Sequence, residues 1–251
     1  MIIILVVSAL IIFWQFAENL INARRLEMGL TGLEAFIPSP ITIFKTFSSH
    51  GNIILVEISH TLRKAFLGCF LGVIIAFFMS IFFLIVPISR NILLPFTFAI
   101  NSFPIVGIAP AIILAFGQGS WGAIVFISAL ISYFPVLISM DTAFKETDQE
   151  VLDLMYVFNA SAMQTFFKVR LPVAVPYFFL SLKLAIPASI IGATMGEWLG
   201  CRVGIGQLIT ISLYQLKPGL LYASLISIVV VSILSILCIK LVEYFCLPWK
   251  R

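Results

Sequence analysis

Charged side chains are scarce in this sequence. Only 10% of its 251 residues are Asp, Glu, Lys or Arg, against about a quarter in ordinary soluble proteins, whereas 61% are hydrophobic. A soluble domain of this length exposes more surface than so few polar groups can cover. The composition therefore excludes a water-soluble enzyme, a disordered chain and a small disulfide-stapled module, and it predicts a membrane protein.

The sequence also lacks the motifs of nucleotide hydrolysis and metal chemistry. It has no Gly-Lys dipeptide, which a phosphate-binding P-loop requires. Its two histidines, His50 and His60, and its four cysteines have neither metal-ligand nor redox spacing. No cluster of Lys and Arg follows the pattern needed for nucleic-acid binding. We expect no enzymatic activity, no catalytic residues, no metal and no cofactor bound by this chain.

Long apolar runs dominate the sequence instead. A helix needs about 20 apolar residues to cross ~30 Å of hydrocarbon, whereas a transmembrane barrel needs short alternating strands. An all-α polytopic membrane protein with about six transmembrane helices is predicted, at residues 2–20, 60–86, 92–115, 121–143, 174–197 and 220–245. In the mixed segment 21–59, Pro38-Ser39-Pro40 predicts a surface turn.

The distribution of basic residues does not orient these spans. If both termini lie in the cytoplasm, equal numbers of Lys and Arg fall on the two sides of the membrane. The positive-inside rule therefore gives no direction. The C-terminal Trp249-Lys250-Arg251 mildly favours a cytoplasmic C-terminus, with Trp249 at the membrane interface.

Residues 144–172 form the one long polar break between the later spans. Thr147 to Glu150 has the pattern of a capping box, in which side chains satisfy the free amides of a helix start. An apolar stripe with helical spacing follows: Val151, Leu154, Met155 and Phe158. The pattern predicts a short amphipathic helix.

A tight turn and a second helix are predicted after this stripe. Asn159 tolerates the left-handed conformation that ends a helix, and Ser161 begins a second capping box, from which a helix runs to about Val169 and then meets Leu171-Pro172. The stripe packs either against the protein's own membrane helices or, as we favour, into the groove of a partner. Five acidic residues in this region offer contacts to basic groups of such a partner: Asp141, Glu146, Asp148, Glu150 and Asp153.

The same stretch resembles the cytoplasmic loop of bacterial ATP-binding-cassette (ABC) importer permeases. That loop reads Glu-Ala-Ala, three residues, Gly, nine residues, Ile, one residue and Leu-Pro. The corresponding residues here are Asp153-Leu154-Met155, Asn159, Val169 and Leu171-Pro172. Every spacing is kept although several identities differ. The two larger residues in place of the alanines imply a partner groove of matched shape.

Other stretches resemble the nitrate/sulfonate/taurine/bicarbonate branch of these permeases. They occur in the order usual for that branch: Ile37-Pro38-Ser39-Pro40, Thr61-Leu62-Arg63, Pro95, Pro104, Pro110, Phe116 to Gly119, Phe134-Pro135, Glu197 and Gly204-Ile205-Gly206. The resemblance covers about residues 36–245. It implies a type I importer (MetI-like) permease fold, with an N-terminal transmembrane helix and external linker in 1–57. The permease core would occupy 58–247 and include a cytoplasmic coupling loop at 144–172.

The resemblance further implies partners, a location and a site. The chain would lie in the bacterial cytoplasmic (inner) membrane with both termini inside, beside a second permease subunit that we expect to be identical. Two copies of an ATPase would use ATP and Mg²⁺, and a solute-binding protein would deliver the solute. The residues expected to contact the ATPase are Glu150, Val151, Asp153, Leu154, Met155, Phe158, Asn159, Ala160, Ser161, Leu171 and Pro172.

The function implied is passage of a small solute, such as an oxyanion, a sulfonate or a small organic molecule like a vitamin precursor. One alternative is a self-sufficient secondary carrier or channel, which needs intramembrane carboxylates for ion coupling. The sequence has almost none at mid-span positions. The other alternative is a membrane assembly subunit that transports nothing.

Two ionisable residues of the fifth span each have two interpretations, since charge in a bilayer costs at least ~2.5 kcal/mol. Lys183 either reaches the cytoplasmic headgroups, paired with a loop carboxylate, or faces the translocation path, where it suits an anionic solute. Glu197 either holds the Gly-rich segment that follows it or contacts solute. Glycines recur at four-residue intervals in this span and in the second: Gly192, Gly196, Gly200, Gly68 and Gly72. Such spacing predicts close helix packing, within one subunit or across a dimer.

Overall fold

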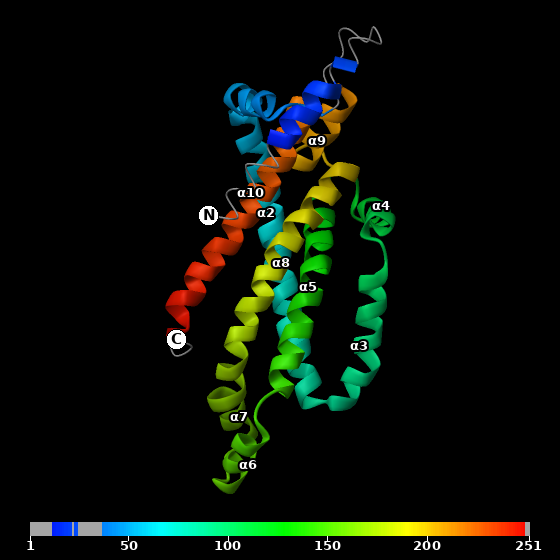
Figure 1. Ribbon diagram of the computed structural model, residues 1–251. Coiled ribbons are helices and arrows are strands. Elements are labelled where there is room, and N and C mark those ends of the chain that lie inside the picture. Colours follow the sequence, from blue (N-terminus) through cyan, green and yellow to red (C-terminus); the bar gives the residue numbers. More distant parts are fainter. Residues whose placement is uncertain (1–11, 22, 25–36, 249–251) are drawn as a thin grey trace.

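The computed structural model describes residues 12–21, 23–24 and 37–248. Within these residues the chain is helical and contains no β-strand (Figure 1). The prediction of an all-α protein is confirmed. The helices are α2 (Pro40–Ile85), α3 (Pro87–Ser102), α4 (Ile105–Phe116), α5 (Trp121–Lys145), α6 (Gln149–Val157), α7 (Ala162–Thr165), a π-helical turn (Phe166–Arg170), α8 (Leu171–Gly200), α9 (Ile205–Tyr214) and α10 (Pro218–Cys246).

Four helices are long and apolar enough to cross a membrane: α2, α5, the continuous helix Ala162–Gly200 that contains α8, and α10. Together, α3 and α4 make a fifth candidate span. The span predicted at 2–20 lies mostly outside the described residues, of which 12–21 are helical. The described part of the chain therefore supplies four or five of the roughly six predicted spans.

Helix α2 is much longer than the span predicted at 60–86. It begins at Pro40, whose fixed φ suits the first position of a helix, and the Ser39 hydroxyl accepts the N–H of Thr42 as its N-cap. Its 46 residues include positions 40–59, assigned above to the mixed segment and, to residue 57, to an external linker. The boundary expected between 57 and 58 therefore falls inside a continuous helix.

The third predicted span, 92–115, is broken into α3 and α4, which meet at an angle of 97°. The residues of this predicted span therefore do not form one continuous helix. Phe103 is extended, with φ −69° and ψ 133°, because the ring of Pro104 disfavours a helical conformation in the preceding residue. Pro104 then forms the N-cap of α4.

The short helix α9 follows α8 and was not among the predicted elements. Gly204 at its N-cap has φ 124°, a conformation open mainly to glycine. A Cβ at this position would lie 2.1 Å from the carboxylate carbon of Glu197. Helix α9 lies at the end of the bundle opposite α6, with the long helices between them (Figure 1).

The core of the bundle consists of α2, α5 and α8, with α5 packed against both others. At Gly68 of α2, an added Cβ would lie 2.4 Å from the Cβ of Ser128 in α5. At Gly192 of α8, it would lie 3.1 Å from the Cα of the same Ser128. The spaced glycines therefore bring three helices together within one subunit, which is the first of their two interpretations.

Candidate functional site

The segment between α5 and α8 forms a helical hairpin, α6 and α7, that projects from one end of the bundle (Figure 1). Helix α6 starts at Asp148, whose carboxylate accepts the N–H of Glu150 at 3.0 Å. The predicted cap at Thr147 is wrong, because Thr147 is buried and its hydroxyl donates to the Phe144 carbonyl. A carboxylate is also favoured beside the positive end of a helix, which explains why Asp148 takes the position.

Two local motifs fix the turn of this hairpin. Asn159 has φ 51°, and its N–H donates to the Tyr156 carbonyl. The N–H of Ala160 donates to the Met155 carbonyl, which completes a Schellman motif. The capping box that begins at Ser161 is present with both of its hydrogen bonds. The left-handed Asn159 and this second capping box are confirmed predictions, and the backbone of the turn needs no partner to be satisfied.

The hairpin exposes a large apolar surface. No residue of α6 is buried, and within the predicted stripe only Met155 is partly shielded. Tyr156 and Val157 lie outside the stripe and are more exposed still, at 86% and 77%. We call the exposed apolar side chains of the hairpin the hairpin face: Val151, Leu154, Tyr156, Val157, Phe158, Met163 and Phe167. This surface is not covered by the chain's own described membrane helices.

Helix α7 continues into α8 through the π-helical turn Phe166–Arg170. The N–H of Leu171 donates to the Phe166 carbonyl, five residues back, and Pro172, which has no N–H to offer, follows directly. The predicted end of the second helix near Val169 is wrong, because the wider turn leads into the proline without a break in the helix. The second arm of the hairpin and α8 are one helix, Ala162–Gly200.

Two side chains tie this helix to the end of α5. The Nη1 of Arg170 donates to the Phe144 carbonyl at 3.0 Å, one of the carbonyls that a helix end leaves without an intrahelical partner. The Tyr177 hydroxyl donates to the Glu146 carboxylate. Glu146 is thus engaged within the chain, although it was expected to be available to a partner.

An ion pair joins α3 to α5 at the same end of the bundle. The Nε of Arg90 lies 2.9 Å and 3.0 Å from the two carboxylate oxygens of Asp141. Lys145 approaches the same carboxylate at 3.5 Å. Asp141 is only 7% exposed, so it binds helices together and is not the partner contact predicted for it.

The opposite end of the bundle contains a fully buried ion pair. The Nζ of Lys64 donates to Oε1 of Glu197 at 2.7 Å, and both side chains are 0% exposed. The Glu197 Oε2 accepts the Thr61 hydroxyl at 2.7 Å and the Gly206 N–H at 3.1 Å. Lys64 also donates to the Val203 carbonyl at 2.9 Å. The cluster joins α2, α8 and the start of α9.

Glu197 therefore holds the Gly-rich segment, the first of its two interpretations, and it has no exposed surface from which to meet solute. Lys64 was missed by sequence reasoning, which counted it only among the basic residues on the outer side of the membrane, at the start of the span predicted at 60–86. Its partner is 133 residues away in the chain. The sequence did contain one indication that Lys64 is buried. Lys64 lies on the same face of the helix as Gly68 and Gly72, four and eight residues further on, and such glycines mark a closely packed face.

Lys183 pairs with Glu243 of α10, so its carboxylate partner is in a membrane helix and not in the loop. The side chains of the two residues are 19% and 22% exposed. Of the two residues suggested for the translocation path, Lys183 is thus the one that keeps some exposed surface.

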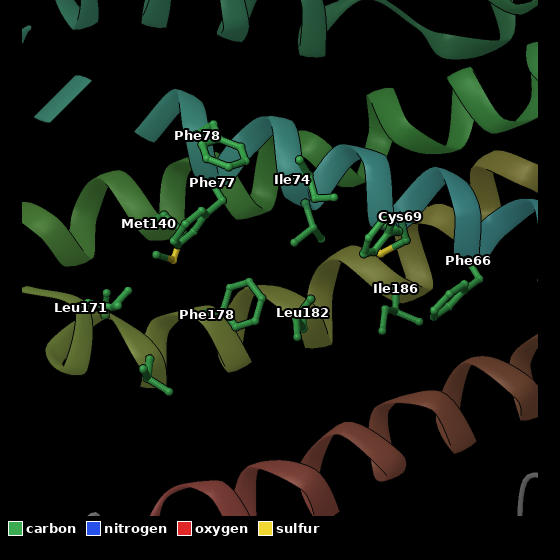
Figure 2. Close-up of a pocket in the computed structure, with 14 residues that line it drawn as sticks. Phe66, Cys69, Ile74, Phe77, Phe78, Met140, Leu171, Phe178, Leu182 and Ile186 are labelled. Atoms are coloured by element: carbon green, nitrogen blue, oxygen red, sulfur yellow. The ribbon is translucent and has the colours of Figure 1, made fainter. Parts of the chain in front are cut away.

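An apolar cavity of about 580 Å³ lies beside α2 and α8 (Figure 2). Its lining includes Phe66 and Phe77 from α2, Met140 from α5, and Phe178 and Leu182 from α8. These side chains offer a polar solute no hydrogen-bond partner. The cavity fits the hydrocarbon surroundings of a membrane helix better than a path for an anion.

The fold of this chain matches that of a solved ABC transporter chain. The MetNI methionine ABC transporter, in an inward-facing conformation, has a chain that superposes with a TM-score of 0.66 at 18% sequence identity. The match covers 76% of this chain and 94% of that one. The predicted MetI-like fold is confirmed.

The sequence places the chain within a family. Residues 60–250 match the family described as binding-protein-dependent transport system inner membrane component, and the chain belongs to this family. It is a multi-pass membrane protein and the transmembrane permease subunit of an ABC importer. Importers of this family work with an ATPase and a solute-binding protein.

Two relatives match nearly the whole chain. A probable ABC transporter permease protein of Haemophilus influenzae is 32% identical over 229 residues, covering 90% of this chain and 88% of the relative. The formylaminopyrimidine transport permease protein ThiX of Halalkalibacterium halodurans is 25% identical over 243 residues, covering 96% and 93%. These likenesses identify a permease subunit, as against a self-sufficient carrier or a non-transporting assembly subunit.

Proposed function

We propose that the hairpin face is the surface on which the ATPase of this importer docks. The single observation that supports this is the exposure of apolar side chains such as Val157 and Phe158 on a capped helix outside the bundle. An amphipathic helix commonly lays such a face into a partner's groove. Glu150 and Asp153 are also exposed and suit basic groups at the rim of that groove.

The connections of the hairpin would let it transmit movement from the ATPase to the membrane helices. Its second arm is continuous with α8, and its first arm follows an α5 whose end is bonded to Arg170 and Tyr177. The pair of Arg90 with Asp141 extends this connection to α3. A displacement of the hairpin by the ATPase would therefore move α8, α5 and α3 together and bias the bundle between two openings.

The chain supplies the pathway and leaves the chemistry to its partners. In this proposal two identical permease chains form the path, and two ATPase copies beneath them use ATP and Mg²⁺. The permease itself is not an enzyme and binds no cofactor. In this proposal both termini lie in the cytoplasm, and α9, at the end of the bundle opposite the hairpin, lies toward the binding protein (Figure 1).

The solute class is a small anion or a small organic molecule. Relatives of this chain are named for formylaminopyrimidine, aliphatic sulfonates and nitrate. Within the chain, Lys183 is the basic group proposed for the path, where it would attract an anionic solute, while Glu197 acts by holding α9 in place.

Replacing Phe158 by Asp tests the docking proposal. A charge on the apolar hairpin face would have to be desolvated on docking, so the variant should remain in the membrane at the wild-type level but lose the co-purifying ATPase. The matched control is Tyr214→Asp, because Tyr214 is 83% exposed on α9 at the other end of the bundle. It should keep the ATPase. Equal ATPase recovery with all three proteins would contradict the proposal.

A further inference from the structure

A second cavity, of about 250 Å³, lies where the hairpin meets the bundle. Its walls come from the end of α2, the first turn of α3, the end of α5, α6 and the π-helical turn. The lining combines charged and apolar side chains, among them Arg90, Asp141, Lys145, Arg170, Phe83 and Leu152. None of the apolar hairpin-face residues belongs to it, so it is a separate surface.

Positive charge prevails in this cavity. Three basic residues, Arg90, Lys145 and Arg170, line it against the single carboxylate of Asp141. Arg90 uses only its Nε on that carboxylate, and Arg170 uses only Nη1 on the Phe144 carbonyl. The other guanidinium N–H groups of both arginines have no protein acceptor among the described residues, so donors for a second anion are already in place.

The cavity lies at the boundary between apolar and polar surface. Ile85 and Ile88, at the junction of α2 and α3, are large exposed apolar side chains, as expected for residues facing lipid. Each follows a cavity-lining residue, Leu84 or Pro87, in the sequence. Phe83 and Pro87 add apolar side chains to the cavity wall. A ligand with an anionic head and an apolar body would match both parts. Basic pockets between membrane helices on the cytoplasmic side are known to take phosphate headgroups.

We propose that this cavity binds a phosphate-bearing anion, either the headgroup of an anionic phospholipid or free phosphate. The anion would bridge Arg90 in α3, Lys145 in α5 and Arg170 at the start of α8, and so brace the junction through which the hairpin moves the bundle. The site goes beyond the docking proposal and uses contacts of this chain alone. It would therefore survive a failure of ATPase docking on the hairpin face.

The test uses the full chain, purified in a neutral detergent and stripped of lipid. Native mass spectrometry follows the binding of dioctanoyl phosphatidylglycerol and, separately, of dioctanoyl phosphatidylcholine. A phosphatidylglycerol titration is repeated with sodium phosphate and with sodium chloride at equal ionic strength. The variants are Arg170→Gln and Lys145→Gln, and the matched control is Lys240→Gln, an exposed lysine of α10 outside the cavity.

The proposal expects saturable binding of phosphatidylglycerol in preference to phosphatidylcholine. Each cavity variant should weaken that binding about fivefold, which corresponds to ~1 kcal/mol per basic residue, and Lys240→Gln should not change it. Competition by phosphate beyond that by chloride would show that free phosphate reaches the site, and no such competition would assign the site to lipid. Equal binding of the two lipids, or no effect of both cavity variants, would overturn the proposal. Loss of the lipid when the chain is isolated with its ATPase would also overturn it, because the cavity would then belong to that partner.

Discussion

The two ends of this bundle are built in opposite ways. At the hairpin end, each helix start is capped by a side chain close in sequence to the N–H that it accepts: Asp148 accepts Glu150 in α6, and Ser161 accepts Gln164 in α7. Apolar side chains are exposed at this end. At the α9 end, a helix start is held by side chains from distant helices, and a charged pair, Lys64 and Glu197, is fully buried.

Because of this difference, we expect one end to determine the stability of the folded bundle and the other to determine its assembly with the ATPase. Burying a charge without its partner is costly, so the α9 end should govern whether the bundle folds. Removing an exposed apolar side chain costs the bundle little, because that side chain has few neighbours to lose. The hairpin end should therefore determine whether the folded bundle binds its ATPase. Three substitutions test this division, in decreasing order of expected effect on stability.

Lys64→Met should have the largest effect. It leaves the Glu197 carboxylate buried without its cation, and breaking such a pair costs about 3–5 kcal/mol. The free energy of unfolding of the purified chain in mixed micelles measures this loss. The double variant Lys64→Met/Glu197→Leu removes both charges and should recover most of the stability, although Thr61 and Gly206 lose their acceptor. A single variant as stable as wild type would refute the importance of the pair.

Gly68→Ala should have a smaller effect. Its new methyl group would lie 2.4 Å from the Ser128 Cβ and 2.7 Å from the Val125 carbonyl, so α2 and α5 must move apart at a cost of about 1–3 kcal/mol. Gly51→Ala is the matched control on the same helix, because nothing lies within 4 Å of its Cβ. The same unfolding measurement should find it neutral or slightly stabilising. A Gly68→Ala variant as stable as Gly51→Ala would contradict the close packing of α2 against α5 at this position.

Asn159→Val should affect the hairpin more than the bundle. A β-branched residue at φ 51° costs roughly 1–2 kcal/mol, which should loosen the turn and lower ATPase recovery several-fold. The unfolding of the bundle should stay near that of wild type. Asn159→Gly is the control and should retain the ATPase, since glycine adopts this conformation freely. A Val variant with full ATPase recovery would show that the rigid turn is not needed for docking.

The same contrast explains what could be predicted from the sequence. The Asn159 turn and the Ser161 capping box depend on neighbouring residues, and both were found. Asp148 was missed because two adjacent residues, Thr147 and Asp148, could each cap α6, and burial of the first decides between them. The long apolar helices were predicted from composition, but the helix break before Pro104 was not predicted.

Ion pairs between residues far apart in the chain could not be predicted from local sequence patterns. Nothing within a few residues of Lys64 indicates that its partner is Glu197, because helix packing brings them together across 133 positions. The fate of Asp141 was missed for the same reason, since its partner Arg90 is 51 residues away. Sequence reasoning placed Lys64 and Asp141 in contact with water or with a partner, whereas both form ion pairs within the bundle.

The position of the two ends relative to the membrane tests the central claim most directly. The exposed Cys238 and Cys246 are first replaced by Ser, and Val157→Cys or Tyr214→Cys is then added as the reporter. In right-side-out membrane vesicles, a membrane-impermeant maleimide should label the Tyr214→Cys chain from outside. The Val157→Cys chain should be labelled only after the vesicles are opened, and less in the presence of the ATPase. Labelling of Val157→Cys in sealed vesicles would contradict the account.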